Sequence, residues 1–320
     1  MRRLFIKIAG LALTGALVSA CGGSNDPGTL AEEASARGFS ALVAASTKAG
    51  LVPALSSSSS NLTVFAPTDA AFTSLATTLG FASATAMVNT LDAATLAKIL
   101  QYHVLPTAKT AAQIAGGGAT QATLYTFEGA ASTLSVSSTG GVKLTDEVLT
   151  QATVTTADVS ASNGVIHVID KVLVPPGVLD IVQMAKLNPT FSVLVEAVVA
   201  ANLANALSGA GPLTVFAPTN DAFTAALTEL SLTKAQLLAS PSLSGILTYH
   251  VVNGNVRAAD VVALPKPASV ATLQGSTFSG GTTLAITDGR TRVANLVATD
   301  VIASNGVIHV IDKVLLPPIN

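Results

Sequence analysis

The chain has 320 residues, which is enough for two domains that each bury a core of their own. Hydrophobic residues make up 49% of it, but beyond the N-terminus no uninterrupted apolar run approaches the ~20 residues of a membrane-spanning helix. The 18 acidic and 16 basic residues nearly balance, so no overall charge attracts the protein to nucleic acid or to anionic lipid. The single cysteine excludes an intramolecular disulfide framework.

The first 21 residues have the pattern of a bacterial lipoprotein signal peptide. Basic residues lie within positions 1–7, an apolar run covers 8–18, and Val18-Ser19-Ala20-Cys21 resembles a lipobox. The resemblance therefore predicts that Cys21 receives lipid and becomes the new N-terminus. Several acyl chains on one residue would give stable membrane anchoring. By resemblance to the sorting rules of enterobacterial lipoproteins, Gly22 in place of Asp after the cysteine favours the outer membrane. The paired arginines also resemble a twin-arginine export signal, which leaves two export routes open.

The segment before residue 80 is predicted to contain a tether, a helical region, a strand and a second helix. These cover, in order, 22–29, 31–55, Leu62–Phe65 and the residues that follow Thr68. Folding is expected to begin near Leu30. Pro67 disfavours helix in the residue before it, and Thr68 or Asp69 is placed to cap the helix that follows.

A third helix is predicted over Ala94–Leu100, and it leads into Tyr102-His103. Beyond it, β-rich segments alternate with Gly-bearing turns, which is typical of strands joined by short loops. The predicted strands of this kind lie at 120–127, 132–136, 141–144 and 153–159 in the first half and at 271–278, 283–286, 291–293 and 296–301 in the second half.

Three motifs of the first half return in the second half in the same order. They are Leu62–Phe72 with Leu213–Phe223, Tyr102-His103-Val104 with Tyr249-His250-Val251, and Asn163–Pro176 with Asn305–Pro318. The spacing between the copies shortens along the chain, as expected when loops lose residues after a domain duplication. We therefore expect a signal peptide at 1–21, a tether at 22–29 and domains at 30–176 and 177–320.

The last of these motifs predicts a hairpin followed by a buried strand. Its Asn-Gly dipeptide is the one best able to occupy both centres of a tight hairpin turn, and a β-branched run follows. Alternation places the histidine of this run on one strand face and the aspartate on the other. The residues concerned are Asn163, Gly164, His167 and Asp170 in the first copy and Asn305, Gly306, His309 and Asp312 in the second.

In this order and spacing, TVFAPTDAAF, YHV and NGVIHVIDKVLVPP resemble the fasciclin domain. The resemblance covers nearly everything after residue 29, in two copies. It implies an α+β fold of two tandem domains, each with a β-wedge or barrel-like core and helices along one edge. It also implies a role in adhesion or extracellular interaction, with no enzymatic chemistry and no cofactor.

The resemblance points to candidate interaction residues. The family's Tyr-His dipeptide falls on Tyr102-His103 and on Tyr249-His250, in a region that is implicated in integrin binding in animal matrix members. An Asp-Ile dipeptide that follows the proline pair falls on Asp180-Ile181, and it has no counterpart after Pro318. We expect function on the exposed surface around these dipeptides, although the motif does not carry an integrin partner over to a bacterium.

All four histidines lie at repeated positions, which raises the question of a metal site. A two-histidine site would need carboxylate or thiolate ligands, and Asp170 and Asp312 are expected on the opposite strand face from the neighbouring histidine. We therefore expect hydrogen-bonded core histidines and no metal. Because no nucleophile elbow, Gly-rich phosphate loop or other catalytic motif occurs, we do not expect an enzyme.

The sequence thus predicts an exported cell-envelope lipoprotein, anchored in the outer membrane through Cys21, that acts as an adhesion or surface-interaction module. Its partner would be a protein or a polysaccharide at the cell surface, and not nucleic acid. The alternative is a periplasmic binding or sensor protein that holds a small apolar ligand between helices and sheet, which would require an apolar pocket on the order of several hundred Å³.

Overall fold

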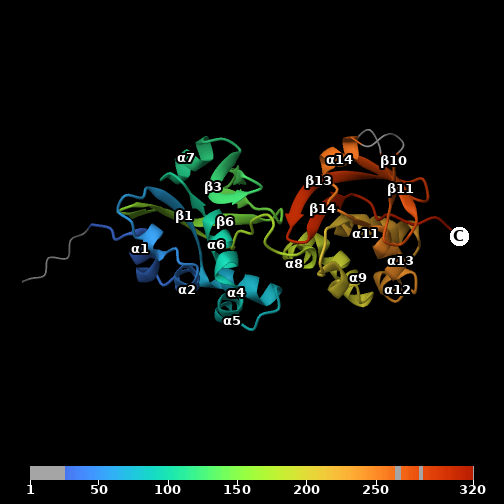
Figure 1. The fold of residues 1–320 in the computed structure, drawn as a ribbon, viewed down its shortest axis with the longest axis horizontal. Helices are drawn as coiled ribbons and strands as arrows, with labels where there is room; N and C mark the ends of the chain where they lie inside the picture. The colour runs from blue at the N-terminus through green and yellow to red at the C-terminus, as the bar shows by residue number, and fades with distance from the viewer. Residues whose placement is uncertain (1–25, 264–267, 281–283, 320) are drawn as a thin grey trace, which may run out of the picture.

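The computed structural model describes residues 26–263, 268–280 and 284–319, without the side chains of 261–263 and 268. Two α+β domains lie side by side along the long axis of the molecule (Figure 1). In the described part of the chain, each domain has one sheet of seven strands that curls into a nearly closed barrel, with helices packed on it. The predicted fold class is therefore confirmed.

The first domain begins with helices and ends with the hairpin motif. Its strands are β1 (Leu62–Pro67), β2 (Val104–Leu105), β3 (Thr120–Phe127), β4 (Ala130–Ser137), β5 (Lys143–Thr145), β6 (Gln151–Ala161) and β7 (Gly164–Ile169). Its helices are α1 (Leu30–Ala36), α2 (Ser40–Lys48), α3 (Val52–Leu55), α4 (Asp69–Thr78), α5 (Ala84–Thr90), α6 (Ala93–Tyr102) and α7 (Ala111–Gly116).

The second domain repeats this order. Its helices are α8 (Ile181–Leu187), η1 (Pro189–Phe191, 3-10), α9 (Ser192–Ala200), α10 (Ala204–Leu207), α11 (Asn220–Glu229), α12 (Lys234–Leu238), α13 (Leu243–Tyr249) and α14 (Ala258–Ala263). Its strands are β8 (Leu213–Pro218), β9 (Val251–Asn253), β10 (Ala268–Ala271), β11 (Thr277–Gly280), β12 (Ala285–Thr287), β13 (Val293–Ala303) and β14 (Gly306–Ile311).

The two sheets have the same topology. The strand orders are β2-β1-β7-β6-β5-β4-β3 and β10-β11-β12-β13-β14-β8-β9. In the first sheet only β1 and β7 run parallel, and Phe65 lies opposite His167 in their register. The second sheet repeats this pairing with Phe216 opposite His309. The duplicated strand is thus central in each sheet, where its β-branched residues are buried on both faces.

Each sheet separates two apolar clusters. In the first domain, Ile166 and Val168 of β7 face the cluster under the helices. Ile169 belongs to the cluster inside the barrel, together with Phe65 and Tyr102. His167 lies on this inner side, where its ring centroid is 5.7 Å from that of Phe65. The alternation expected for this strand is therefore present.

Several expected elements differ from the observed ones, and Thr283 of the expected strand 283–286 lies outside the described residues. The helical region 31–55 is divided into α1, α2 and α3, because Gly38 and Gly50 adopt φ values of 78° and 70° that end the first two helices. The expected strand 271–278 contains the turn between β10 and β11. Residues 291–292, expected in a strand, precede β13, and Thr291 has a φ of 58°.

The helix after β1 is capped by Thr68 and not by Asp69. Thr68 Oγ1 accepts a hydrogen bond from the Ala71 N–H at 3.2 Å. Asp69 Oδ1 instead accepts from the Ala41 N–H at 2.9 Å, so it fastens the start of α2 to the start of α4. Asn220 makes the same kind of bond to the Val193 N–H, at 3.0 Å, in the second domain.

Candidate functional site

Tyr102 and His103 lie at the C-terminal end of α6, and each is only 1% exposed. Tyr102 Oη donates to Thr133 O at 3.0 Å. The His103 ring joins Ile99 O through Nδ1, at 2.7 Å, and the Leu173 N–H through Nε2, at 2.8 Å. Because Nε2 accepts, the proton of the neutral ring is assigned to Nδ1. Burial lowers the pKa of His103 to about 4, so the ring is neutral at neutral pH.

The second domain repeats this arrangement. Tyr249 Oη donates to Thr277 O at 2.8 Å, and the His250 ring joins Ile246 O and the Leu315 N–H, both at 2.8 Å. Burial lowers the pKa of His250 to about 4 as well. The expectation of hydrogen-bonded core histidines therefore holds for both dipeptides, whose side chains are not on the surface, while function on the exposed surface around them stays a prediction. Both dipeptides end helices that pack on the sheet, and their polar groups bond to the backbone inside the fold.

The other two histidines join distant backbone segments. His167 Nδ1 accepts from the Asp158 N–H at 3.2 Å, and its Nε2 donates to Lys109 O at 2.9 Å. Asp158 lies in a bulge of β6 with a φ of 58°, and its Oδ1 accepts from the Ala111 N–H at the start of α7. The histidine therefore fixes the bulge that in turn fixes a helix terminus.

His309 does the same in the second domain. Its Nδ1 accepts from the Asp300 N–H at 3.3 Å, and its Nε2 donates to Val256 O at 2.8 Å. Burial lowers its pKa. Among the residues that the structure describes, no group of three or more His, Cys, Asp or Glu side chains is arranged to hold a metal ion. All four histidines thus have both ring nitrogens engaged within the fold.

Asp180 and Ile181 begin α8 and contribute to the second domain. Asp180 caps the helix, since its Oδ1 accepts from the Gln183 N–H at 2.8 Å while Gln183 Oε1 accepts from the Asp180 N–H. Ile181 is 3% exposed in the apolar cluster under the helices, so its side chain is not on the surface. Only Asp180 of this pair is partly accessible.

The hairpin turn differs from the expected one. Gly164 pairs with Ala161 and is already in β7, so the two loop residues are Ser162 and Asn163, and neither has a positive φ. The expectation of Asn-Gly at both turn centres is therefore wrong. Gly164 is required for another reason: a Cβ at this position would overlap with Leu62 O of the adjacent β1. Gly306 meets Leu213 O in the same way.

The asparagine of each motif ties the turn to the helices. Asn163 is 2% exposed, and its Oδ1 accepts from the Leu30 N–H at 2.8 Å. Its Nδ2 donates to Leu55 O and Ser57 O, both at 2.9 Å. Asn305 makes the corresponding bonds at 2.8 to 3.0 Å. The aspartates stay near the surface, where Asp170 Oδ1 and Asp312 Oδ1 accept from backbone N–H groups of β6 and β13 at 2.7 Å.

Two buried carboxylates are missing from the sequence-based set. Asp146 accepts from Lys171 Nζ at 2.6 Å and from the Val174 N–H at 2.9 Å. Asp288 accepts from Arg292 Nη2 at 2.7 Å and from the Leu316 N–H at 2.9 Å. Burial acts to raise the pKa of Asp288, but these hydrogen bonds outweigh it and hold the pKa below its ordinary value. The sequence feature that could have indicated these two aspartates is the repeated tripeptide, Leu-Thr-Asp at 144–146 and Ile-Thr-Asp at 286–288.

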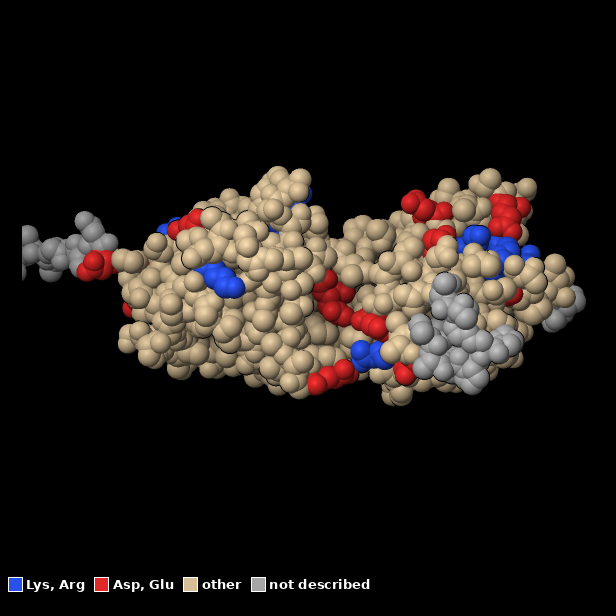
Figure 2. Space-filling model, turned by 90° about the horizontal axis from the view of Figure 1, so that it is seen from above, with Lys and Arg blue, Asp and Glu red and all other residues tan. Residues whose placement is uncertain are grey.

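The two domains meet at a junction with polar contacts, beside which Val148 of the first domain is buried in the apolar cluster of the second domain. Glu147 Oε1 accepts from the Ile302 N–H at 2.6 Å, and the Gly177 N–H donates to Ile302 O at 2.9 Å. Arg257 Nη2 pairs with Glu128 Oε1 at 2.7 Å beside a pocket of about 540 Å³. Figure 2 shows a band of acidic side chains along the groove between the domains, with basic side chains beside it. Burial raises the pKa of Glu147 to about 7.

A smaller apolar pocket lies between helices and sheet in each domain. The volume is about 130 Å³ in the first domain and about 30 Å³ in the second. Both are well below the volume that a carrier of an ordinary small-molecule ligand would need.

Within the described residues, no helix has the length and hydropathy of a membrane span. Cys21 and the rest of the expected signal peptide lie outside the described residues.

These observations define a protein of two duplicated α+β domains whose histidines and Asn-Gly motifs serve the scaffold. The model of the fasciclin domain matches residues 37–175 and 189–317, more than half of the chain. The chain therefore belongs to the fasciclin domain family.

Several curated proteins are similar to single portions of the chain. Protein sll1483 of a Synechocystis strain is 48% identical over 146 residues, which are 44% of this chain and 74% of that protein. Immunogenic protein MPB70 of Mycobacterium bovis is 39% identical over 124 residues, which are 37% of this chain and 55% of that protein. Transforming growth factor-beta-induced protein ig-h3 of Sus scrofa is 36% identical over 164 residues, 50% of this chain but 22% of that protein.

Among solved structures, a FAS1 domain pair from the insect cell adhesion molecule Fasciclin I covers 89% of this chain and 98% of its own chain. The sequence identity is 20% and the TM-score is 0.45.

Proposed function

We propose that this protein is a cell-envelope lipoprotein that acts as an adhesion or surface-interaction module through its two fasciclin domains. The observation that carries the proposal is the match of both halves to the fasciclin domain, a family whose general role is adhesion or extracellular interaction. Lipid on Cys21 would hold the module at the outer membrane, with residues 22–29 as the tether. Its partner is a protein or a polysaccharide of the cell surface.

The buried Tyr-His dipeptides enter this proposal as positioning residues. The strand that follows each dipeptide pairs with β1 or with β8, so the exposed residues at its end are presented on a fixed support. These residues are Pro106 and Thr107 in the first domain and Asn253 and Asn255 in the second. With two such segments on one chain, a partner that offers two sites would be bound with higher avidity.

The proposal is tested on intact cells. Deletion of residues 28–320 behind an intact lipobox is expected to reduce attachment or aggregation of the cells, and unchanged behaviour would contradict an adhesive role. Thr107→Arg with Asn253→Arg should reduce attachment without loss of protein, whereas Ala44→Arg on the exposed side of α2 serves as the matched control.

The anchor and the location are tested separately. Cys21→Ser is expected to release the protein from the membrane fraction, and persistent membrane association would refute lipid anchoring. Protease added to intact cells should digest the domains if they face outward. Complete protection would place them in the periplasm and would speak for the alternative function.

That alternative, a periplasmic binding or sensor protein for a small apolar ligand, has one observation in its favour. An apolar pocket of about 130 Å³ is present in the first domain. Ligand sites for ordinary small molecules measure roughly 300 Å³ or more, so this pocket is smaller than a binding or sensor protein for such a ligand would need.

A further inference from the structure

The apolar pocket of the first domain lies beneath α1 and α2. Its walls come from Leu30 of α1, Leu42 of α2, Val64 of β1 and Ile166 of β7, and its volume is about 130 Å³. Ser35 and Thr47 lie on its rim and are exposed. The pocket therefore opens to solvent between the two helices, which gives a small molecule a route of entry.

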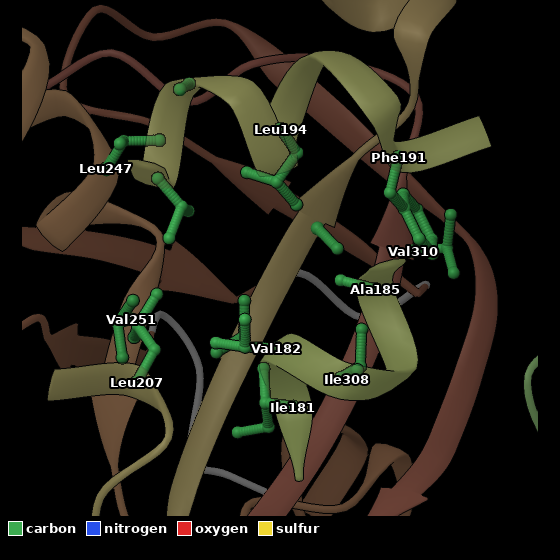
Figure 3. Close-up of a cluster of buried hydrophobic side chains, with 14 of the residues drawn as sticks. Ile181, Val182, Ala185, Phe191, Leu194, Leu207, Leu247, Val251, Ile308 and Val310 are labelled. Carbon is green, nitrogen blue, oxygen red and sulfur yellow. The ribbon is translucent and has the colours of Figure 1, made fainter. Parts of the chain in front are cut away.

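The second domain has the same site in a nearly filled form. Leu30 and Ile181 correspond, because the N–H of each donates to the side chain of the motif asparagine. Figure 3 shows the equivalent cluster, where Ile181, Val182 and Leu194 converge beneath α8 and α9. The space left there is about 30 Å³. One scaffold thus carries an open and a closed version of the site.

Two residue differences account for the open version. Ala31 of α1 corresponds to Val182 of α8, and Ser46 of α2 corresponds to Val198 of α9. Both residues of the first domain are smaller than their counterparts and line the open pocket. Both valines line the closed one. Replacing large core residues by smaller ones leaves space that the surrounding structure fills only in part.

The lining selects an uncharged ligand. None of the described side chains that line the pocket is an acid, a lysine or an arginine. The rim hydroxyls of Ser35 and Thr47 already donate to Ala31 O at 3.0 Å and Val43 O at 2.8 Å. His103 at the pocket wall has both nitrogens engaged. Ser46 is the remaining hydroxyl in the lining, so a charged or strongly polar headgroup would lose its hydration with at most this one hydroxyl as compensation.

We propose that this pocket is a binding site for a small uncharged aromatic molecule, about the size of one benzene ring. An apolar cavity of about 150 Å³ in another protein stays dry and takes up benzene, so a volume of this order is sufficient for such a ring. The site is specific to the first domain, and its occupancy is independent of the adhesive role.

The test uses toluene as the probe and the full chain carrying Cys21→Ser. Methyl NMR signals of Leu42, Val104 and Ile166 are expected to shift in a saturable way, while those of Leu194, Val251 and Ile308 stay unchanged. Absence of shifts up to the solubility limit of toluene would overturn the proposal, as would equal shifts in both domains.

Matched variants exchange the two linings. Ala31→Val with Ser46→Val should weaken toluene binding at least tenfold, and Val182→Ala with Val198→Ser should create binding in the second domain. The second variant keeps the test decisive if the first one fails to fold. Binding that is unaffected by Ala31→Val with Ser46→Val, or a second domain that stays closed to toluene after its own exchange, would contradict the assignment.

Discussion

At the scale of the residue, the four histidines serve as connectors within the backbone. A neutral imidazole offers one donor and one acceptor at a fixed angle, and each ring uses both on main-chain groups that are far apart in the sequence. An apolar ring of similar size would fill the space but leave a buried N–H and a buried carbonyl unpaired. The repeated histidines are therefore explained by hydrogen-bond geometry.

His103→Phe is expected to lower the free energy of unfolding of the first domain by about 2 kcal/mol, because the Leu173 N–H loses its acceptor inside the core. His250→Phe should have the same effect in the second domain, through Leu315. Urea unfolding with a probe in each domain measures both changes. A loss below about 0.5 kcal/mol in both variants would show that water or another group replaces the ring.

The same two histidines predict acid sensitivity. Their pKa values are about 4 in the folded protein and near 6.5 in an unfolded chain, so the unfolded state binds more protons in between. Their contribution to stability is complete above pH 6.5 and is lost as the pH falls through 4. The melting temperature should therefore decrease as the pH is lowered from 7.5 to 4. The fall should be smaller when both histidines are phenylalanine, and an identical slope would contradict the prediction.

At the scale of the element, the periodic strands and caps were predictable, whereas the hairpin turn was not. Asn-Gly is a strong turn signal by itself, but the glycine at position 164 is needed because β1 approaches it closely. The contacting residue, Leu62, is 102 positions earlier in the chain, so a local sequence pattern does not reveal it. The division of 31–55 into three helices follows from Gly38 and Gly50, and glycine after a helical segment is a helix-end signal that can be recognised in the sequence. Core histidines were expected from the sequence, but their backbone partners at Leu173 and Leu315 are 70 and 65 positions away, so only tertiary packing identifies them.

Gly164→Ala tests this account of the hairpin. The added methyl group would collide with Leu62 O, so we expect a loss of about 3 kcal/mol in the unfolding free energy of the first domain. Gly116→Ala is the control, because nothing lies within 4 Å of a Cβ built there and α7 covers this position. Its expected effect is about 1 kcal/mol or less, in the stabilising direction. Equal effects of the two substitutions would refute a role for close strand approach.

At the scale of the molecule, the duplication was readable from the sequence, and the contact between the copies was not. A sequence repeat identifies the residues that both halves have in common, but the contact between the domains is made by residues that differ between the halves. Glu147 lies directly after the repeated Leu-Thr-Asp, and Gly289 holds the corresponding place after Ile-Thr-Asp, so no periodic signal marks it. Its partner Ile302 belongs to the other domain. Such a contact is set by how the domains dock, which only the three-dimensional arrangement shows.

Glu147 makes the junction sensitive to pH in the opposite direction from the histidines. Burial raises its pKa to about 7, against 4.5 for a free glutamate, although the hydrogen bond from the Ile302 N–H lowers it. Asp146 and Asp300 raise the pKa further, and Arg257 lowers it. Its favourable contribution is therefore complete below pH 4.5 and is lost as the pH rises through 7. Glu147→Gln keeps an acceptor for the Ile302 N–H without the charge, so it should stabilise the protein by about 2 kcal/mol at pH 8 and have little effect at pH 4.5. Melting curves at both pH values measure this, with the exposed Glu196→Gln as control. A gain that is the same at both pH values, or a loss at pH 8, would show that the ionised carboxylate is the form that holds the domains together.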